Sequence, residues 1–158
     1  MDQPDYPVVN ITIVEARDFA QAAGKRLPKG LEWEKAARGT DGRMFPWGNE
    51  EDATLANVGG KSLQPVTAFP KGESPYHVLQ MVGNVWEYID EEVSPTTDPG
   101  SLELFGKVLS AAPNQKWHAT RGLSFREGLH KSVLYDISLA PDQWKSDSVG
   151  FRCVKDVP

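Results

Sequence analysis

The segment that says most about this chain reads Met81-Val82-Gly83-Asn84-Val85-Trp86-Glu87. Its glycine and asparagine interrupt an apolar run, which is typical of a tight bend between two packed segments. Trp86 is a large apolar side chain that can anchor a loop lacking a sheet ladder of its own. We therefore predict a short strand over residues 82–88, with a sharp backbone bend at Gly83.

Two helices are predicted upstream of this segment. Thr12 and Glu15 fit a capping box at the start of the first helix, and Gly24 is placed to end it in the left-handed conformation. A second helix is expected from about Gly30 to Arg38, with a weak N-cap in Lys29. One apolar stripe of the first helix consists of Ala16, Phe19, Ala20 and Ala23.

The rest of the chain is rich in turn residues. Short apolar pieces at 66–69, 82–88, 119–125 and 150–154 alternate with Gly, Pro, Asn and Asp, which predicts short strands between long loops. The acidic run over residues 90–92 is interpreted as a solvated loop. The expected class is α+β, with two helices, short strands and many long loops.

The composition excludes several classes of function. A chain of 158 residues is the size of one domain, and a net charge of -5 does not favour nucleic acid as a partner. No apolar run is long enough to insert into a membrane, and the first residues do not read as a signal peptide, so no compartment is assigned. The single cysteine, Cys153, excludes an internal disulfide and a cysteine-rich zinc site and is interpreted as a small buried hydrophobic residue.

Six motifs follow one another along the chain. They are Gly24-Lys25-Arg26-Leu27-Pro28, Glu32-Trp33-Glu34-Lys35-Ala36-Ala37-Arg38-Gly39, Phe45-Pro46-Trp47-Gly48, Met81 to Glu87, Arg121-Gly122-Leu123-Ser124-Phe125 and Gly150-Phe151-Arg152-Cys153-Val154. Taken in this order, the motifs over residues 7–154 resemble those of the formylglycine-generating enzyme family, also called sulfatase-modifying factor domains. This resemblance implies a variant of the C-type lectin fold with short antiparallel strands.

The resemblance also defines where catalytic residues would lie. The enzymes of this family carry two copper-binding cysteines a few residues after the motif that corresponds to Arg121–Ser124, and two soft thiolates suit Cu(I). In one alignment these positions hold Glu127 and Ser132, and in the other they hold Leu129 and Leu134. Either alignment removes the pair, so we expect neither bound copper nor formylglycine-generating activity.

Calcium is the metal that the resemblance leaves open. Members of the family share a calcium site that would here use hard oxygen ligands from Gln80, Gly83, Val85 and Glu87. Gln80 replaces the usual Asp or Asn, so a lower affinity is expected. A second family site would use Asn57 and Val58, but the loop that follows lacks an acidic partner. The expected role of calcium is structural.

Three hypotheses about function follow. The first is a non-catalytic binding or sensory module for a protein, peptide or sugar, with a binding surface that consists of Trp117, Glu127, His130, Tyr135 and Trp144. The alternative is an enzyme of the same family with different metal-dependent oxidative chemistry, which a cluster of His118 or His130 with carboxylates at a cleft would favour. The third is a purely structural domain.

The domain organisation is also predicted from the resemblance. Family domains are longer and carry an N-terminal part that this sequence lacks, so residues 1–158 are expected to form a single reduced domain or a fragment of a longer protein. Similar domains form the C-terminal part of larger bacterial proteins, including serine/threonine kinases. This context would suit a sensory module.

Overall fold

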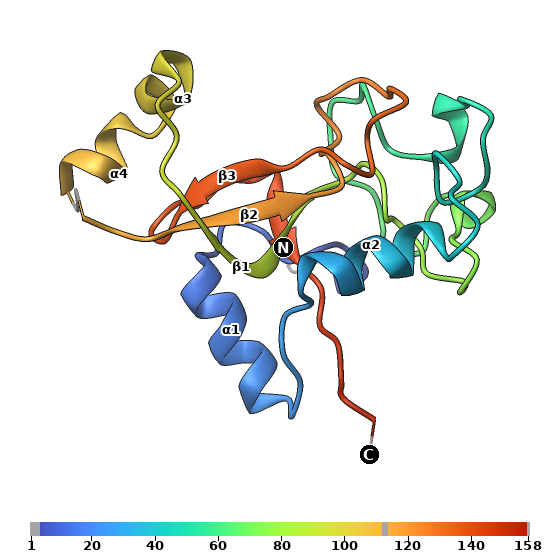
Figure 1. The fold of residues 1–158 in the computed structure, drawn as a ribbon, viewed down its shortest axis with the longest axis horizontal. Coiled ribbons are helices and arrows are strands. Elements are labelled where there is room, and N and C mark those ends of the chain that lie inside the picture. Colours follow the sequence, from blue (N-terminus) through green and yellow to red (C-terminus); the bar gives the residue numbers. More distant parts are fainter. Residues whose placement is uncertain (1–3, 112–113, 158) are drawn as a thin grey trace.

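A mixed four-stranded sheet organises the molecule, and the computed structural model describes residues 4–111 and 114–157. The order in the sheet is β3-β2-β1-β4 (Figure 1). The strands are β1 (Trp86–Val93), β2 (Trp117–Arg121), β3 (Ser138–Pro141) and β4 (Val149–Phe151).

One strand pair differs from the expected antiparallel pattern. β1 pairs with β2, and β2 with β3, in the antiparallel sense, but β4 runs parallel to β1. The chain over residues 142–148 returns from the far edge of the sheet to the start of β1, where Trp86 N donates to Ser148 O at 2.9 Å. β4 therefore enters the sheet in the same direction as β1.

Helix α1 (Ile13–Ala22) starts as the sequence predicts. Glu15 N donates to Thr12 Oγ1 at 3.2 Å, and Thr12 N donates to Glu15 Oε2 at 2.7 Å, which completes the capping box. Gly24 has φ +66° just after the helix, as expected. Phe19 differs from its predicted place on the buried stripe, because 61% of it is exposed.

Helix α2 (Gly30–Arg38) lacks a side-chain N-cap and uses two carboxylates instead. Lys29 N donates to Glu32 Oε2 at 2.8 Å, and Gly30 N donates to Glu91 Oε1 at 2.9 Å. A Cβ on Gly30 would lie only 2.5 Å from that same oxygen of Glu91. A larger residue at the start of this helix would therefore displace the Glu91 carboxylate from its hydrogen bond to the helix.

The acidic run was expected to be a solvated loop, and this prediction is wrong. Residues 90–92 belong to β1, and each carboxylate has a partner. Arg17 Nη2 lies 2.7 Å from Asp90 Oδ1, Glu91 accepts from the start of α2, and Lys116 Nζ lies 2.6 Å from Glu92 Oε2. These contacts offset the repulsion between the three neighbouring carboxylates and allow the acidic run to form a strand.

Two short helices were not predicted. They are α3 (Pro99–Leu104) and α4 (Gly106–Ala111), which stand apart from α1 and α2 at the upper left of Figure 1. Asp98 caps α3, because Ser101 N donates to its Oδ2 at 2.8 Å, and Pro99 occupies the first helical position. The sequence Asp-Pro-Gly reads as a turn but here starts a helix.

The segment at 66–69 was predicted as a strand, and the structure shows turns there instead. Phe69 has φ 58° and leads into the 3-10 helix η2 (Pro70–Gly72), which contacts a second one, η1 (Ala53–Leu55). A residue at positive φ does not continue a strand. The apolar side chains of this segment therefore belong to a packed loop.

The core has two parts, one on each face of the sheet. Helix α1 packs on the face that carries Tyr88 and Ala140, whereas α2 packs on the face that carries Ile89 and Ala119. Trp86 contacts both clusters and joins them. The α+β class is confirmed, with two short helices beyond the predicted pair. Within the described residues, no helix has the length and apolar character to cross a bilayer.

Candidate functional site

The bend at Gly83 joins two buried loops. Gly83 has φ 78°, and a Cβ there would collide with the carbonyl oxygen of Asn57. Asn84 N donates to that carbonyl at 2.9 Å, and Asn57 Nδ2 donates to Asn84 Oδ1 at 3.0 Å. The predicted bend is confirmed, and its reason is the close approach of the two backbone segments.

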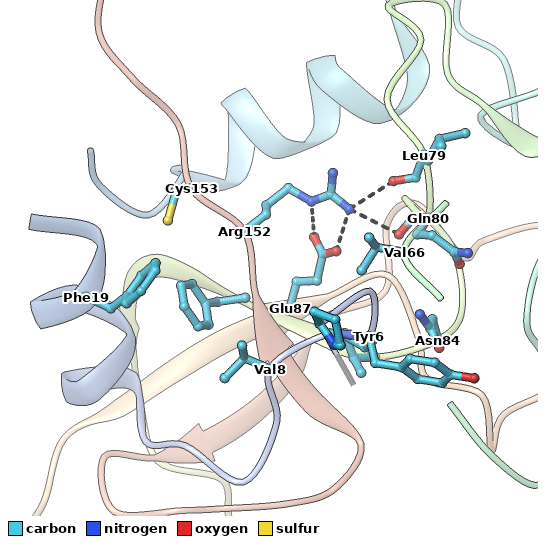
Figure 2. Close-up of a pocket in the computed structure, with 14 residues that line it drawn as sticks. Tyr6, Val8, Phe19, Val66, Leu79, Gln80, Asn84, Glu87, Arg152 and Cys153 are labelled. Atoms are coloured by element: carbon cyan, nitrogen blue, oxygen red, sulfur yellow. Dashed lines mark hydrogen bonds and ion pairs between the residues drawn. The ribbon is translucent and has the colours of Figure 1, made fainter. Parts of the chain in front are cut away.

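Glu87 lies at the centre of a buried polar cluster and is only 4% exposed. Trp33 Nε1 donates to Glu87 Oε2 at 2.7 Å, and Arg152 donates to both carboxylate oxygens at 2.6 Å (Figure 2). Burial by itself would lower the pKa of the Arg152 guanidinium, but the charge and hydrogen bonds of Glu87 outweigh it and raise that pKa. The cluster ties α2, β1 and the end of β4 together.

The same guanidinium also holds a loop. Arg152 Nη2 donates to the carbonyl oxygens of Leu79 and Gln80, both at 3.2 Å. Gln80 Nε2 donates to Ala68 O at 2.9 Å, while its Oε1 is buried and accepts no hydrogen bond. Three of the four predicted calcium ligands, Gln80, Val85 and Glu87, line one pocket.

The second predicted calcium site lies at Asn57 and Val58. Asn57 Nδ2 donates to Ser62 O at 3.0 Å as well as to Asn84, so its amide group holds the loop over residues 59–62. Among the residues that the structure describes, no group of three His, Cys, Asp or Glu side chains gathers in a way that suits a metal ion. The second site stays a prediction.

The positions expected for the copper cysteines lie in the segment after β2. Leu134 is fully buried, and Leu129 packs against the same core cluster. Arg121 Nη1 donates to Leu134 O at 3.0 Å, which fixes this segment against the sheet. In the other alignment, Glu127 Oε2 accepts hydrogen bonds from Ser124 N and Oγ, and Ser132 Oγ donates to Asp136 at 3.2 Å. Neither alignment provides a thiolate, so these residues do not fit a Cu(I) site.

A groove of about 710 Å³ opens on the face of the sheet that α1 covers, and we call it the sheet-face groove. Its aromatic walls are Trp86, Phe105 and Trp144, and the ring of Phe105 meets that of Trp144 edge-on at 4.8 Å. An ion pair between Arg126 Nη2 and Asp147 Oδ2, 2.6 Å apart, lies at its rim. The other lining residues are Asn10, Leu104, Thr120, Glu127, Ser138, Leu139, Ala140, Lys145, Ser146, Ser148 and Val149.

The structure brings together only some of the five residues predicted for the binding surface. Glu127 and Trp144 both line the sheet-face groove. Trp117 is buried and does not line the groove, and it packs edge-on against Phe105, with the ring centres 5.2 Å apart. Tyr135 is 54% exposed and lies under the Arg38 guanidinium, 4.5 Å from the ring centre, outside the groove.

His130, the fifth predicted residue, forms a small surface cluster. Its Nδ1 lies 3.1 Å from Ser132 Oγ, and its Nε2 lies 3.1 Å from Asp136 Oδ2. His118 is buried, with Nε2 2.7 Å from Asp142 Oδ1 but outside hydrogen-bond geometry. Neither histidine lines the sheet-face groove, so the two histidine–carboxylate pairs do not form the cleft cluster that would favour an enzyme.

Sequence reasoning did not single out Phe105 or Leu104 for the groove. Leu104 is the last residue of α3 and Phe105 follows it, in a stretch where the sequence predicts no helix or strand. Asn10 is also missed, although φ 59° at a non-glycine residue marks it as a special position in the structure. No local pattern in the sequence could place these three residues beside Trp144.

The geometry agrees with the comparisons to known proteins. Residues 1–157 match the family model described as "Sulfatase-modifying factor enzyme 1-like domain". The chain belongs to this family. The expected resemblance is therefore confirmed over almost the whole chain, and the framework residues Gly83, Trp86 and Glu87 fall inside the matched range.

Curated relatives include both active and inactive proteins. Hercynine oxygenase of Mycolicibacterium smegmatis is 43% identical over 98 residues, which cover 58% of this chain and 23% of that protein. The formylglycine-generating enzyme of Mycobacterium tuberculosis is 30% identical, covering 98% of this chain and 59% of the relative. The inactive Cα-formylglycine-generating enzyme 2 of Bos taurus is 29% identical, covering 94% and 50%. The chain thus spans about a quarter to three-fifths of these relatives.

Solved structures support the fold. CarF superimposes with a TM-score of 0.77 at 19% identity, covering 99% of this chain and 70% of that one. PvdO from Pseudomonas aeruginosa gives a TM-score of 0.73 at 20% identity, covering 96% and 62%. At these identities the likeness shows the fold alone.

Proposed function

We propose that this domain is a non-catalytic binding module of the sulfatase-modifying factor family that engages a peptide or protein segment in the sheet-face groove. The observation that carries the proposal is the contrast between two neighbouring regions. Neither alignment places a thiol at the two expected positions, and in one of them the positions hold Leu134, which is buried, and Leu129, which packs against the core, while the groove bordered by Glu127 and Ser138 stays open.

The groove has the features of a recognition site. Trp86, Phe105 and Trp144 supply flat apolar surfaces, and aromatic residues of this kind dominate the energetics of many interfaces. The rim carries the exposed charges of Arg126, Asp147 and Lys145, which suit polar contacts around an apolar centre. Such a lining favours an apolar side chain flanked by polar backbone.

A matched pair of variants tests the groove. Leu104 is 61% exposed and lines it, whereas Leu31 is 80% exposed on α2 outside it. Short peptides are first selected from a random displayed library for binding to the wild-type domain. These peptides should bind the Leu104→Asp variant about tenfold more weakly, which is equivalent to ~1.4 kcal/mol. They should bind the Leu31→Asp variant with unchanged affinity. A library that yields no saturable binder, or binders that ignore Leu104→Asp, would contradict the proposal.

We also propose that the first calcium site is retained with low affinity. Gln80 Oε1 is a buried acceptor without a donor, which is the state expected of an oxygen left free for a cation. A carboxylate has about four lone-pair positions, and three N–H groups occupy Glu87, so one position stays available. The adjacent charge of Arg152 opposes a second cation, which keeps the affinity low.

Thermal unfolding in millimolar calcium and in chelator tests this calcium site. We expect a higher Tm with calcium, because an ion bound only by the folded state stabilises it. The shift should vanish in Gln80→Leu, which removes the free oxygen, and persist in Gln21→Leu, an exposed position on α1. An identical Tm in calcium and chelator, or a shift that survives Gln80→Leu, would count against the site.

A second candidate function is an enzyme with metal-dependent oxidative chemistry, and the similarity to hercynine oxygenases favours it. Within residues 4–111 and 114–157 no suitable metal cluster is formed, so the metal ligands would come from another domain. Calorimetry with hercynine separates the two candidates. Saturable binding of hercynine to this chain supports the enzyme, and saturable peptide binding that is weakened by Leu104→Asp supports the peptide module.

A further inference from the structure

We infer that a second pocket, at the junction of α1, β4 and the segment over residues 4–8, binds a neutral planar aromatic small molecule. This pocket has a volume of about 480 Å³ and is shown in Figure 2. It shares no lining residue with the sheet-face groove, so the inference is independent of the proposed peptide site. It does include Gln80, Val85 and Glu87 of the proposed calcium site, so the inference concerns the calcium-free protein. We call it the β4 pocket.

The walls of the β4 pocket are mostly apolar. Phe19 on α1 meets the ring of Phe151 edge-on, with the ring centres 5.7 Å apart. Val8 is 59% exposed, Phe19 61% and Val66 43%, and all three line the same pocket. Three exposed apolar side chains around one opening are unfavourable in water, and an apolar ligand would cover them.

The polar groups of the pocket explain the preference for a neutral ligand. Within the described part of the chain, the charged residues lining it are Glu87 and Arg152, which already neutralise each other. Burial raises the pKa of the Cys153 thiol, against a smaller lowering by Lys25, so this group is uncharged at neutral pH. A charged ligand would lose its hydration without gaining a counter-ion.

The size of the pocket selects a small molecule over a long chain. A volume of about 480 Å³ lies within the ~300–1,000 Å³ typical of small-molecule sites, which are mainly apolar with a few polar groups. An edge-on aromatic pair such as Phe19 and Phe151 favours a further ring, because aromatic rings pack in offset or edge-to-face arrangements. The ligand class is therefore a flat, uncharged ring compound.

Cys153 provides a direct readout, since it is the single cysteine of the chain and lines the pocket. The experiment is done in chelator, so that no calcium occupies the pocket. It measures the rate at which neutral iodoacetamide alkylates Cys153, followed by intact mass, while indole is titrated. We expect indole to slow alkylation saturably. Indole acetate, which carries a carboxylate, should need an at least about tenfold higher concentration, because the site offers it no counter-ion.

Two valine variants control the experiment. Val66 is 43% exposed and lines the pocket, whereas Val14 is 42% exposed and lies outside it. Val66→Trp should fill the pocket and abolish protection by indole, while Val14→Trp should behave as wild type. Phe19→Ser, at a more exposed wall position, provides a second test and should weaken protection if Val66→Trp does not fold.

Several outcomes would overturn the inference. These are a lack of protection by indole, equal protection by indole acetate, and protection that persists in both Val66→Trp and Phe19→Ser. Size-exclusion chromatography tests one further possibility. A dimer that persists in indole but is dissociated by Phe19→Ser would show instead that a second chain covers the pocket. Indole should still protect Cys153 from alkylation in Leu104→Asp. This variant therefore distinguishes ligand binding in the β4 pocket from peptide binding in the sheet-face groove.

Discussion

Arg152→Met should lower the free energy of unfolding by about 3–5 kcal/mol, because it leaves the Glu87 carboxylate buried without its cation. Glu87 is 4% exposed, and its remaining donor is Trp33 Nε1. The variant also frees the carbonyl groups of Leu79 and Gln80, which Arg152 holds. Urea denaturation followed by circular dichroism measures the loss.

Two controls define the origin of this effect. Lys116→Met breaks the exposed ion pair with Glu92 and should change stability by less than about 1 kcal/mol. The double variant Glu87→Met with Arg152→Met should be less destabilised than Arg152→Met alone, since no unpaired carboxylate remains. A loss below about 1 kcal/mol for Arg152→Met would show that the cluster has little role in stability.

Gly83→Ala should destabilise the domain by roughly 3 kcal/mol or more. The residue has φ 78°, where an alanine is strained, and its Cβ would overlap the carbonyl oxygen of Asn57. The bend carries the hydrogen bond from Asn84 N to Asn57 O, so relief of the overlap would break it. The stability change is measured by the same denaturation experiment.

Gly42 offers a matched control for Gly83. It has the same φ of 78°, and a Cβ there would meet nothing within 4 Å. Gly42→Ala therefore isolates the backbone strain, which we expect to cost about 1 kcal/mol. Equal losses in the two variants would show that the contact with Asn57 is not the reason for glycine at residue 83.

The sequence predicted those parts of the fold whose signals are local. The capping box of Thr12 and Glu15 and the bend at Gly83 are confirmed, because each depends on residues a few positions apart. The parallel pairing of β1 with β4 was not predicted, since it depends on the path of a long connection. The acidic run was misread because its partners, such as Arg17 and Lys116, are distant in sequence.

The candidate site was predictable to a smaller extent. The sequence predicted five residues for a binding surface, and two of them, Glu127 and Trp144, line the sheet-face groove. It could not place Phe105, which reaches the groove from the unpredicted α3–α4 connection. The partnership of Glu87 with Arg152 was also missed, because it joins residues from β1 and the end of β4.

The most direct test of the central claim is incubation of the domain with copper and a cysteine-containing sulfatase peptide, followed by mass spectrometry. The claim is that the family framework is kept without the thiol pair, since neither Glu127 and Ser132 nor Leu129 and Leu134 are cysteines and Cys153 lies in the closing segment. We predict no mass loss at the peptide cysteine. Conversion of that cysteine to formylglycine would contradict the account.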